Sequence, residues 1–299
     1  MNKSIHIFNK TLATSTLAAA SLAAHGVPIE PGDYIPLPGG SFIGVGYYNY
    51  AHSEKLNVDG VGDIKNDTSL NLNSGLLRAV WYPKTSSLSY NLQMLMPFAS
   101  VNSEVAGASA STNGVRAGDP MFGAVVWPLN DPQNGRYLGL ASITSFPLGS
   151  YDRFRPVSVG RNTWTENLQA VFVQQFKSGW QLDVAGDVIF YGDNNDYGAA
   201  ATGKTFSQKN TYQLQLWLSK QLTPATGAGI GYTIVKGGQQ KVDGQPNGLR
   251  TDYQQVRLYA SHFLNKTWQV LGEVNHAFAT TGGFNQDFGL TLRVVKLFQ

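Results

Sequence analysis

Asp183 and Asp187 are two carboxylates four residues apart, a pair that could hold a metal ion or exchange a proton. They fall in the segment WQLDVAGDVIFY (180–191), where apolar and polar residues alternate, so both belong to the polar face of one extended segment. Four residues of strand span about 13 Å at a rise near 3.3 Å per residue. Because two groups that far apart cannot share a proton, we expect both aspartates to line a polar interior surface.

Ser261, His262 and His276 are the residues from which a lipid hydrolase could be built. Alternation along the segment 251–263 places Ser261 and His262 on opposite faces, so no triad geometry is evident. We therefore predict no catalytic residue and no enzymatic activity. The alternative to a protein without enzymatic activity is a lipid-acting enzyme of the outer membrane. Such an enzyme would need serine and histidine on one face at matching depth.

Three short motifs resemble parts of nucleotide or ion sites. GKT at 203–205 lacks the glycine spacing of a phosphate loop, and GAGIG at 227–231 is followed by no helix. The segment DNNDYGAAATG at 193–203 carries several oxygen ligands that could bind Ca²⁺ weakly. We predict no cofactor and no metal ion.

Arg257, Glu273 and Arg293 lie on the polar faces of three consecutive extended segments, five or six residues from the same end. A charge in surroundings this poor in charge needs a partner, so we expect the three side chains to form an ionic layer. Such a layer could simply fill an interior, or it could help to select what passes through it. The sequence leaves both roles open.

The segment GSYDRFRPVSVGRN (149–162) concentrates charged and aromatic side chains in a loop. An arginine-rich loop can remain a solvated surface, or it can fold inward and narrow a channel. The residues that would form such a constriction are Tyr151, Asp152, Arg153, Phe154, Arg155 and Arg161.

All these residues belong to a chain with one repeated rhythm, in which an alternating segment ends in turn at a short connection or at a long polar loop. This rhythm is typical of a transmembrane β-barrel, because lipid-facing and lumen-facing residues alternate and the two barrel ends carry connections of different length. The fold class predicted is all-β, an antiparallel up-and-down barrel of twelve strands. The expected strands are 42–51, 71–82, 88–101, 118–128, 136–147, 163–176, 180–191, 209–222, 227–236, 251–263, 267–278 and 286–298.

Composition agrees with a membrane barrel. Only 14% of the 299 residues are charged, against roughly 25% in ordinary soluble domains, and there is no cysteine. The formal net charge of +3 falls to +1 when Lys3 and Lys10, the charged residues of 1–26, are set aside. A nucleic-acid partner therefore has no support in the charge.

The N-terminal part divides into two segments before the barrel, which we place at 42–299. Residues 1–26 combine two lysines with a short apolar run and predict a secretory signal peptide. Residues 27–41 carry four prolines and three glycines, which exclude a helix and a sheet ladder. This lead segment is either a periplasmic tail or a plug in the barrel mouth.

Four stretches carry a resemblance to a known family: PGDYIPLPGGSFIGVGYYNYAHS (31–53), GDPMFGAVVWPLNDP (118–132), FPLGSYDRFRPVSVGRNTW (146–164) and SGWQLD (178–183). They are similar to outer-membrane proteins of the family named for the MetA pathway of phenol degradation. The resemblance implies a barrel grouped with transporters of small, often aromatic, compounds.

The function expected from these observations is passive uptake of small hydrophobic or aromatic compounds through the outer membrane of a Gram-negative bacterium. The expected partners are outer-membrane lipid, the permeant and the outer-membrane assembly machinery. A structural or adhesive barrel without a conduit is a second alternative. Twelve strands lie between the eight whose lumen is filled and the sixteen that leave an aqueous channel, so we expect a narrow or plugged path.

Overall fold

A computed structural model describes residues 27–85, 88–199 and 203–298 of the chain. The predicted signal peptide, 1–26, lies outside the described residues. Within the described residues the secondary structure is strand and turn, and no helix is long and apolar enough to cross a membrane.

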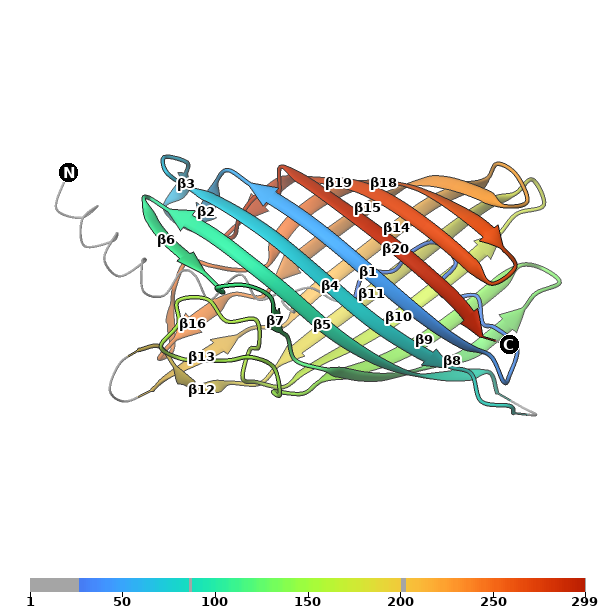
Figure 1. The fold of residues 1–299 in the computed structure, drawn as a ribbon, viewed down its shortest axis with the longest axis horizontal. Helices are drawn as coiled ribbons and strands as arrows, with labels where there is room; N and C mark the ends of the chain where they lie inside the picture. The colour runs from blue at the N-terminus through green and yellow to red at the C-terminus, as the bar shows by residue number, and fades with distance from the viewer. Residues whose placement is uncertain (1–26, 86–87, 200–202, 299) are drawn as a thin grey trace.

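Twelve long antiparallel strands form one closed barrel (Figure 1). Each pairs with its neighbours along the chain, and β1 closes the ring on β20, from the pair Phe42 and Phe298 to the pair His52 and Phe288. The strands are β1 (Phe42–Ser53), β4 (Ser69–Trp81), β5 (Tyr90–Val105), β8 (Met121–Asp131), β9 (Arg136–Ser145), β10 (Thr165–Gln175), β11 (Trp180–Tyr191), β14 (Thr211–Gln221), β15 (Thr226–Gly237), β18 (Asp252–Asn265), β19 (Trp268–Thr281) and β20 (Phe288–Phe298).

The predicted fold class and strand number are confirmed, and every predicted strand ends within four residues of an observed one. The largest difference, four residues, lies at the end of β5. β8 begins three residues later than expected, because Pro120 has no N–H to donate to a ladder. β5 runs on to Val105 because it pairs with a short strand of the outer loop, β6 (Ala108–Ser111).

Period-two alternation explains the two faces of the wall. On β14, Gln213 and Gln215 are buried in the lumen, whereas Tyr212 and Leu214 face outward and are exposed. Trp180, Trp268 and Phe298 are exposed at the end with short turns, the position that an aromatic girdle takes in transmembrane barrels. The wall is apolar outside and polar inside, the opposite of the arrangement in a soluble protein.

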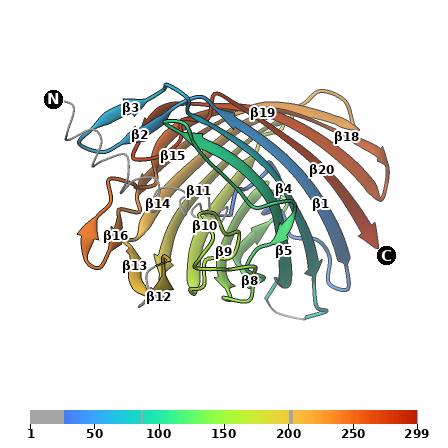
Figure 2. The ribbon, with the colours of Figure 1, turned by 60° about the vertical axis from the view of Figure 1, so that its left-hand side comes forward.

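Tight turns connect the strands at one end, such as the turn 176–179, in which Gly179 adopts a φ of +78°. At the other end the loops carry further short strands, shown together in Figures 1 and 2 on the side away from the C-terminus. These are β2 (Leu56–Val58), β3 (Gly62–Ile64), β6, β7 (Arg116–Ala117), β12 (Asn194–Tyr197), β13 (Lys204–Gln208), β16 (Gln240–Val242) and β17 (Gln245–Pro246).

The outer loops pack on one another and are less polar than their sequences suggest. An apolar cluster joins Leu56 and Val58 of the first loop to Val157 and Leu249 of two others, and all four are almost fully buried. Phe284 of the last loop packs against the same cluster. The outer end of the lumen is thus covered by a small apolar core of its own.

Among neighbouring barrel strands, β5 and β8 share the shortest ladder within the described residues. Their ladder runs only from the pair Tyr90 and Val126 to the pair Leu95 and Met121. Pro97 then follows on β5, and its carbonyl accepts a hydrogen bond from Gly118 N–H at 2.8 Å instead of continuing the ladder. The other neighbouring pairs of barrel strands share at least eight residue pairs in the described residues.

Candidate functional site in the barrel lumen

The lead segment, residues 27–41, lies inside the barrel. Ile29 and Tyr34 are almost fully buried in an apolar cluster with wall residues. Two tryptophans of the wall donate to its backbone: Trp217 Nε1–H to the Ile29 carbonyl at 3.0 Å, and Trp127 Nε1–H to the Tyr34 carbonyl at 2.9 Å. The Tyr34 hydroxyl in turn donates to Gln169 Oε1. The segment is therefore held from several sides of the wall at the end with short turns.

Charged pairs add to this attachment. Arg257 forms ion pairs with Glu273 at 2.8 Å and with Glu30 of the lead segment at 3.0 Å. Its guanidinium also stacks on the Trp217 ring, 4.5 Å from the ring centroid. One buried arginine thus links two wall strands to the lead segment.

Arg293 does not join Arg257 and Glu273 in a single layer, as the sequence had led us to expect. It forms an ion pair with Asp33 of the lead segment at 2.9 Å, and Arg78 approaches the other oxygen of Asp33 at 3.7 Å. The reason is geometric: Glu273 is paired across the ladder with Thr291, two residues from Arg293, and the lead segment supplies a nearer carboxylate. The expected layer is in fact two ion-pair groups, each completed by the lead segment.

Burial acts on the acid of the first group. Against the opposing charge of Arg257, it raises the pKa of the Glu30 carboxyl to about 8, and the neighbouring carboxylate of Glu273 works in the same direction. Two carboxylates compete for one guanidinium at this point. The lead segment therefore carries a group that titrates near neutral pH.

Asp183 and Asp187 are both buried on the inner face of β11 and bind different partners. Asp183 accepts a hydrogen bond from Gly32 N–H of the lead segment at 3.1 Å. Asp187 accepts from the carboxamides of Gln169 and Gln215 on the neighbouring strands, at 2.5 and 3.3 Å. The pair is used for attachment and wall packing, and within the described residues no group of three or more acidic or histidine side chains could hold a metal ion.

The loop 149–162 lies at the outer end, away from the lumen cavity described below. Arg153 forms an ion pair with Asp196 at 2.6 Å, Arg155 one with Asp152 at 3.2 Å, and Phe154 is exposed. A separate cavity of about 250 Å³ against β12 and β13 is lined by Tyr151, Asp152, Arg153, Phe154 and Arg155. The structure does not bring them into the lumen cavity.

Arg161 is the buried arginine of this loop. Its guanidinium donates to Gln208 Oε1 at 2.7 Å and lies 4.9 Å from the ring centroid of Tyr191. Its backbone N–H donates to Asp119 at 2.7 Å, and Gly149 N–H donates to the other oxygen of the same carboxylate at 2.8 Å. Through these two hydrogen bonds Asp119 holds both ends of the loop just before the start of β8. Burial raises the pKa of its carboxyl group.

A cavity of about 420 Å³ lies in the lumen, with Glu30 of the lead segment on one side and Phe284 of the outer loops on another. One side carries most of the leucine, isoleucine and proline residues of the lining, from β4, β5, β9 and β11, together with Ser74 of β4 and Thr165 and Asn167 of β10. The apolar residues of this wall are Leu70, Leu72, Leu76, Leu95, Pro97, Ile143 and Ile189.

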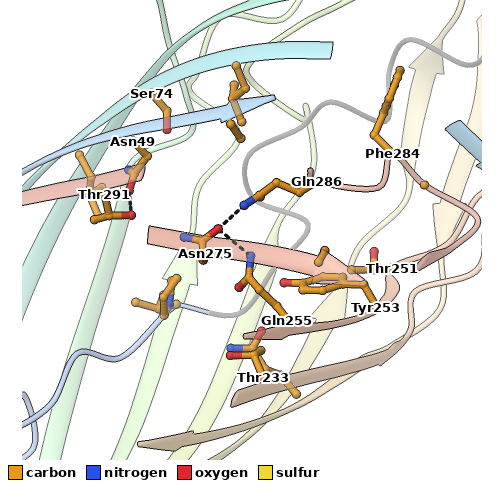
Figure 3. Close-up of a pocket in the computed structure, with 18 of the residues that line it drawn as sticks. Asn49, Ser74, Thr233, Thr251, Tyr253, Gln255, Asn275, Phe284, Gln286 and Thr291 are labelled. Atoms are coloured by element: carbon orange, nitrogen blue, oxygen red, sulfur yellow. Dashed lines mark hydrogen bonds between the residues drawn. The ribbon is translucent and has the colours of Figure 1, made fainter. Parts of the chain in front are cut away.

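The facing wall is rich in carboxamides (Figure 3). Asn275 Oδ1 accepts from Gln255 Nε2 at 3.0 Å and from Gln286, while Asn275 Nδ2 donates to Glu273 at 2.9 Å. Gly289 stands opposite Asn275 on β20, and a Cβ there would lie 2.1 Å from Asn275 Oδ1. Only glycine leaves space for this amide cluster.

The residues considered for a hydrolase do not assemble into one. His262 is exposed, and its Nδ1 lies 2.9 Å from Thr226 Oγ1. Ser261 pairs with Gly227 on the adjacent strand and is half-buried, on the opposite face. His276 contacts the Asp287 carbonyl at 2.7 Å.

Sequence reasoning missed the residues that receive the lead segment, namely Arg78, Trp127 and Trp217. A signal was nevertheless present. The wall residues of the two ion-pair groups include three arginines but only one acid, Glu273, and the lead segment contains two carboxylates, Glu30 and Asp33. Charge balance inside a low-charge barrel would have directed those acids into the lumen.

Fold and site together define an outer-membrane β-barrel with an internal cavity, a protein of the channel and transporter class. Residues 47–294 match the model of the family described as "Putative MetA-pathway of phenol degradation", and the chain belongs to this family. It is also similar to the crystal structure of an outer membrane channel from Pseudomonas putida F1, with 30% sequence identity and a TM-score of 0.84. That match covers 91% of this chain and 100% of the channel.

More distant structures share the fold alone. The translocator domain of the autotransporter NalP from Neisseria meningitidis has 12% identity and a TM-score of 0.50, covering 88% of this chain and 89% of that one. The β-domain of the Bordetella autotransporter BrkA has 11% identity and a TM-score of 0.53, covering 87% and 100%. No curated protein matches the chain in sequence. The family and the similarity to the outer membrane channel from Pseudomonas putida F1 place the chain in the outer membrane of Gram-negative bacteria.

Proposed function

We propose that this barrel admits small hydrophobic or aromatic compounds through the outer membrane by passive diffusion. The observation that carries the proposal is the cavity of about 420 Å³ between the lead segment and the outer loops, with one wall of leucine, isoleucine and proline side chains. Contact with an apolar molecule removes apolar surface of this wall from water, which stabilises binding. Contact with a sugar or an ion brings no such stabilisation.

The charge distribution supports the same substrate class. Three ion pairs within the lumen join lead-segment acids to wall arginines, so these pairs hold the lead segment in place instead of lining an open aqueous path. A general diffusion pore for hydrophilic solutes needs a wide, wetted lumen. The family description refers to phenol degradation, which supports uptake of compounds of this kind. Similarity to the outer membrane channel from Pseudomonas putida F1 supports a channel without indicating its substrate.

The test is uptake of labelled toluene and labelled glucose by cells of an outer-membrane-bearing host with and without the chain. We expect faster toluene uptake with the chain and unchanged glucose uptake. Equal toluene uptake in the two strains would contradict the proposal.

A matched pair of variants on β4 provides the control. Ser74 lines the cavity, whereas Leu77 faces outward and is 60% exposed. Ser74→Trp should fill part of the cavity and slow toluene uptake, and Leu77→Trp should leave uptake unchanged because its ring lies in lipid.

A further inference from the structure

Five buried polar atoms of residues that line the cavity have no hydrogen-bond partner within the described residues. Two of them, Gln213 Oε1 and Thr233 Oγ1, belong to neighbouring strands on the carboxamide side. Both side chains are more than nine-tenths buried, with exposed fractions of 6% and 4%. A buried polar atom without a partner costs free energy, so such atoms are uncommon and point to a bound molecule that completes them.

The two atoms belong to one surface. Gln213 lies on β14 and Thr233 on β15, and Thr233 is paired across the ladder with Gln215, two residues from Gln213 on the same face. Gln215 Oε1 accepts from the Ile29 N–H of the lead segment at 3.1 Å, so this surface lies next to the lead segment. Figure 3 shows Thr233 near Gln255, with the amide cluster beyond it.

The apolar wall lies across the lumen from this surface. β4 and β14 are six strands apart around a ring of twelve, as are β5 and β15. Leu72 and Leu76 on β4 and Leu95 and Pro97 on β5 line the same cavity. A molecule in the cavity therefore meets hydrogen-bonding groups on one side and an apolar surface on the other.

The arginines that line the cavity already have acidic partners. Arg257 pairs with Glu30 and Glu273, Arg78 with Asp33 at 3.7 Å, and Arg250 with Asp59 at 3.3 Å and Asp252 at 3.8 Å. An anionic molecule would therefore lie beside these carboxylates. Each described arginine of the lining is already paired with an acid and would not balance the added negative charge. This arrangement favours an uncharged molecule.

We propose that the cavity is a binding site for an uncharged molecule with a ring-sized apolar body and one hydroxyl group, such as an alkylated phenol. The hydroxyl donates to Gln213 Oε1 and accepts from the Thr233 hydroxyl, while the apolar body packs on Leu72, Leu95 and Pro97. An apolar cavity of about 150 Å³ holds benzene, so the larger cavity here has space for a substituted ring. The inference rests on the proposed function and adds to it the chemical class of the permeant.

The test compares three probes on the purified, refolded chain in detergent: 4-propylphenol, propylbenzene and 4-propylbenzoate. Calorimetry or tryptophan fluorescence gives the Kd of each probe, and the quantity compared is the ratio of Kd for propylbenzene to Kd for 4-propylphenol. We expect this ratio to fall about fivefold in Thr233→Val and in Gln213→Leu, the effect of one hydrogen bond of ordinary strength. We expect 4-propylbenzoate to bind weakest of the three.

Ser145→Ala is the matched control. Ser145 Oγ is also buried without a partner, but Ser145 does not line the cavity, so its variant should leave the ratio unchanged. Migration before and after boiling reports whether each variant is folded. Thr233→Val removes a hydroxyl that makes no bond in the protein, so this variant should fold and decides the question if Gln213→Leu does not.

A ratio that is the same in the native chain, Thr233→Val and Ser145→Ala would overturn this site, as would equal binding of 4-propylbenzoate and 4-propylphenol. The proposed function is judged separately by toluene uptake in cells. Uptake with an unchanged probe ratio would leave the channel in place and remove only the hydroxyl site.

Discussion

Arg257 is the residue through which the wall and the lead segment are most closely joined. Besides its two carboxylate partners, its guanidinium lies 3.4 Å from both the Ile29 carbonyl and Gln215 Oε1. Arginine suits this position because its planar guanidinium carries five N–H donors and stacks on an aromatic ring at the same time. Removing one of its carboxylate partners weakens the compensation of a buried charge.

Replacing Glu273 with Ala should therefore destabilise the folded barrel. Breaking a buried ion pair costs about 3–5 kcal/mol, but Glu30 remains as a second partner of Arg257, so we expect a loss of about 1–3 kcal/mol in the free energy of unfolding. Urea titration of the refolded protein in lipid vesicles measures it. Asp63→Ala, which removes an exposed partner of Lys55 in an outer loop, should change the same quantity by less than about 1 kcal/mol.

Attachment of the lead segment should depend on pH through Glu30. Its pKa is about 8 in the lumen and near 4.5 when the segment is released into water, so the seated segment binds a proton that the released segment does not hold between these values. The stabilisation is complete below pH 4.5, falls as the pH rises to 8 and is constant above. Channel conductance in planar bilayers should accordingly increase from pH 5 to pH 8. In Glu30→Gln the increase should disappear, and a pH dependence identical to that of the native chain would contradict this assignment.

At the scale of elements, the strands were predictable and the lead segment was not. A period of two fixes which face each wall residue occupies, so the inward positions of Asp183, Asp187, Arg257 and Glu273 followed from alternation alone. The lead segment has no period, and its conformation is set by contacts with strands more than a hundred residues away, such as that between Gly32 and Asp183.

The outer loops show the same limit. Their polar composition suggested solvated connections, yet they contribute an apolar cluster and eight short strands. Leu56, Val157 and Leu249 lie in three different loops and gain burial because these loops meet. Sequence alone does not show which loops lie side by side in a barrel, since each loop contacts partners beyond its own hairpin.

The loop 149–162 depends on one carboxylate for its position. Asp119 accepts from both Gly149 N–H and Arg161 N–H, so Asp119→Ala leaves two backbone donors without a partner. We expect faster chymotryptic cleavage after the exposed Phe154 in this variant, while the barrel remains assembled. Asp152→Ala, which removes an exposed carboxylate of the same loop, is the control and should change the cleavage rate much less. Equal rates in the two variants would show that Asp119 does not fix the loop.

At the scale of the whole molecule, the barrel is a cylinder covered at both ends by segments that are not part of its wall. The lead segment covers the end with short turns, and the apolar cluster of the loops covers the other. The cavity between them is bordered by both, through Glu30 and Phe284. A passive channel of this design excludes most solutes and depends on the lead segment for the composition of its lumen.

Deleting residues 27–36 should open the barrel and change its ion preference. The deletion removes Ile29 and Tyr34 from the lumen, and the twelve-strand wall persists because its ladders do not involve the lead segment. It also removes Glu30 and Asp33, so Arg78 and Arg293 lose the acid that pairs with them and the lumen becomes more positive. We therefore expect higher single-channel conductance together with a shift toward anions, measured as a reversal potential in a salt gradient.

The double variant Glu30→Gln, Asp33→Asn keeps the segment's bulk and removes its charge, and should shift selectivity toward anions with a smaller rise in conductance. Unchanged conductance in the deletion, with normal migration before and after boiling, would mean that the lead segment does not obstruct the channel.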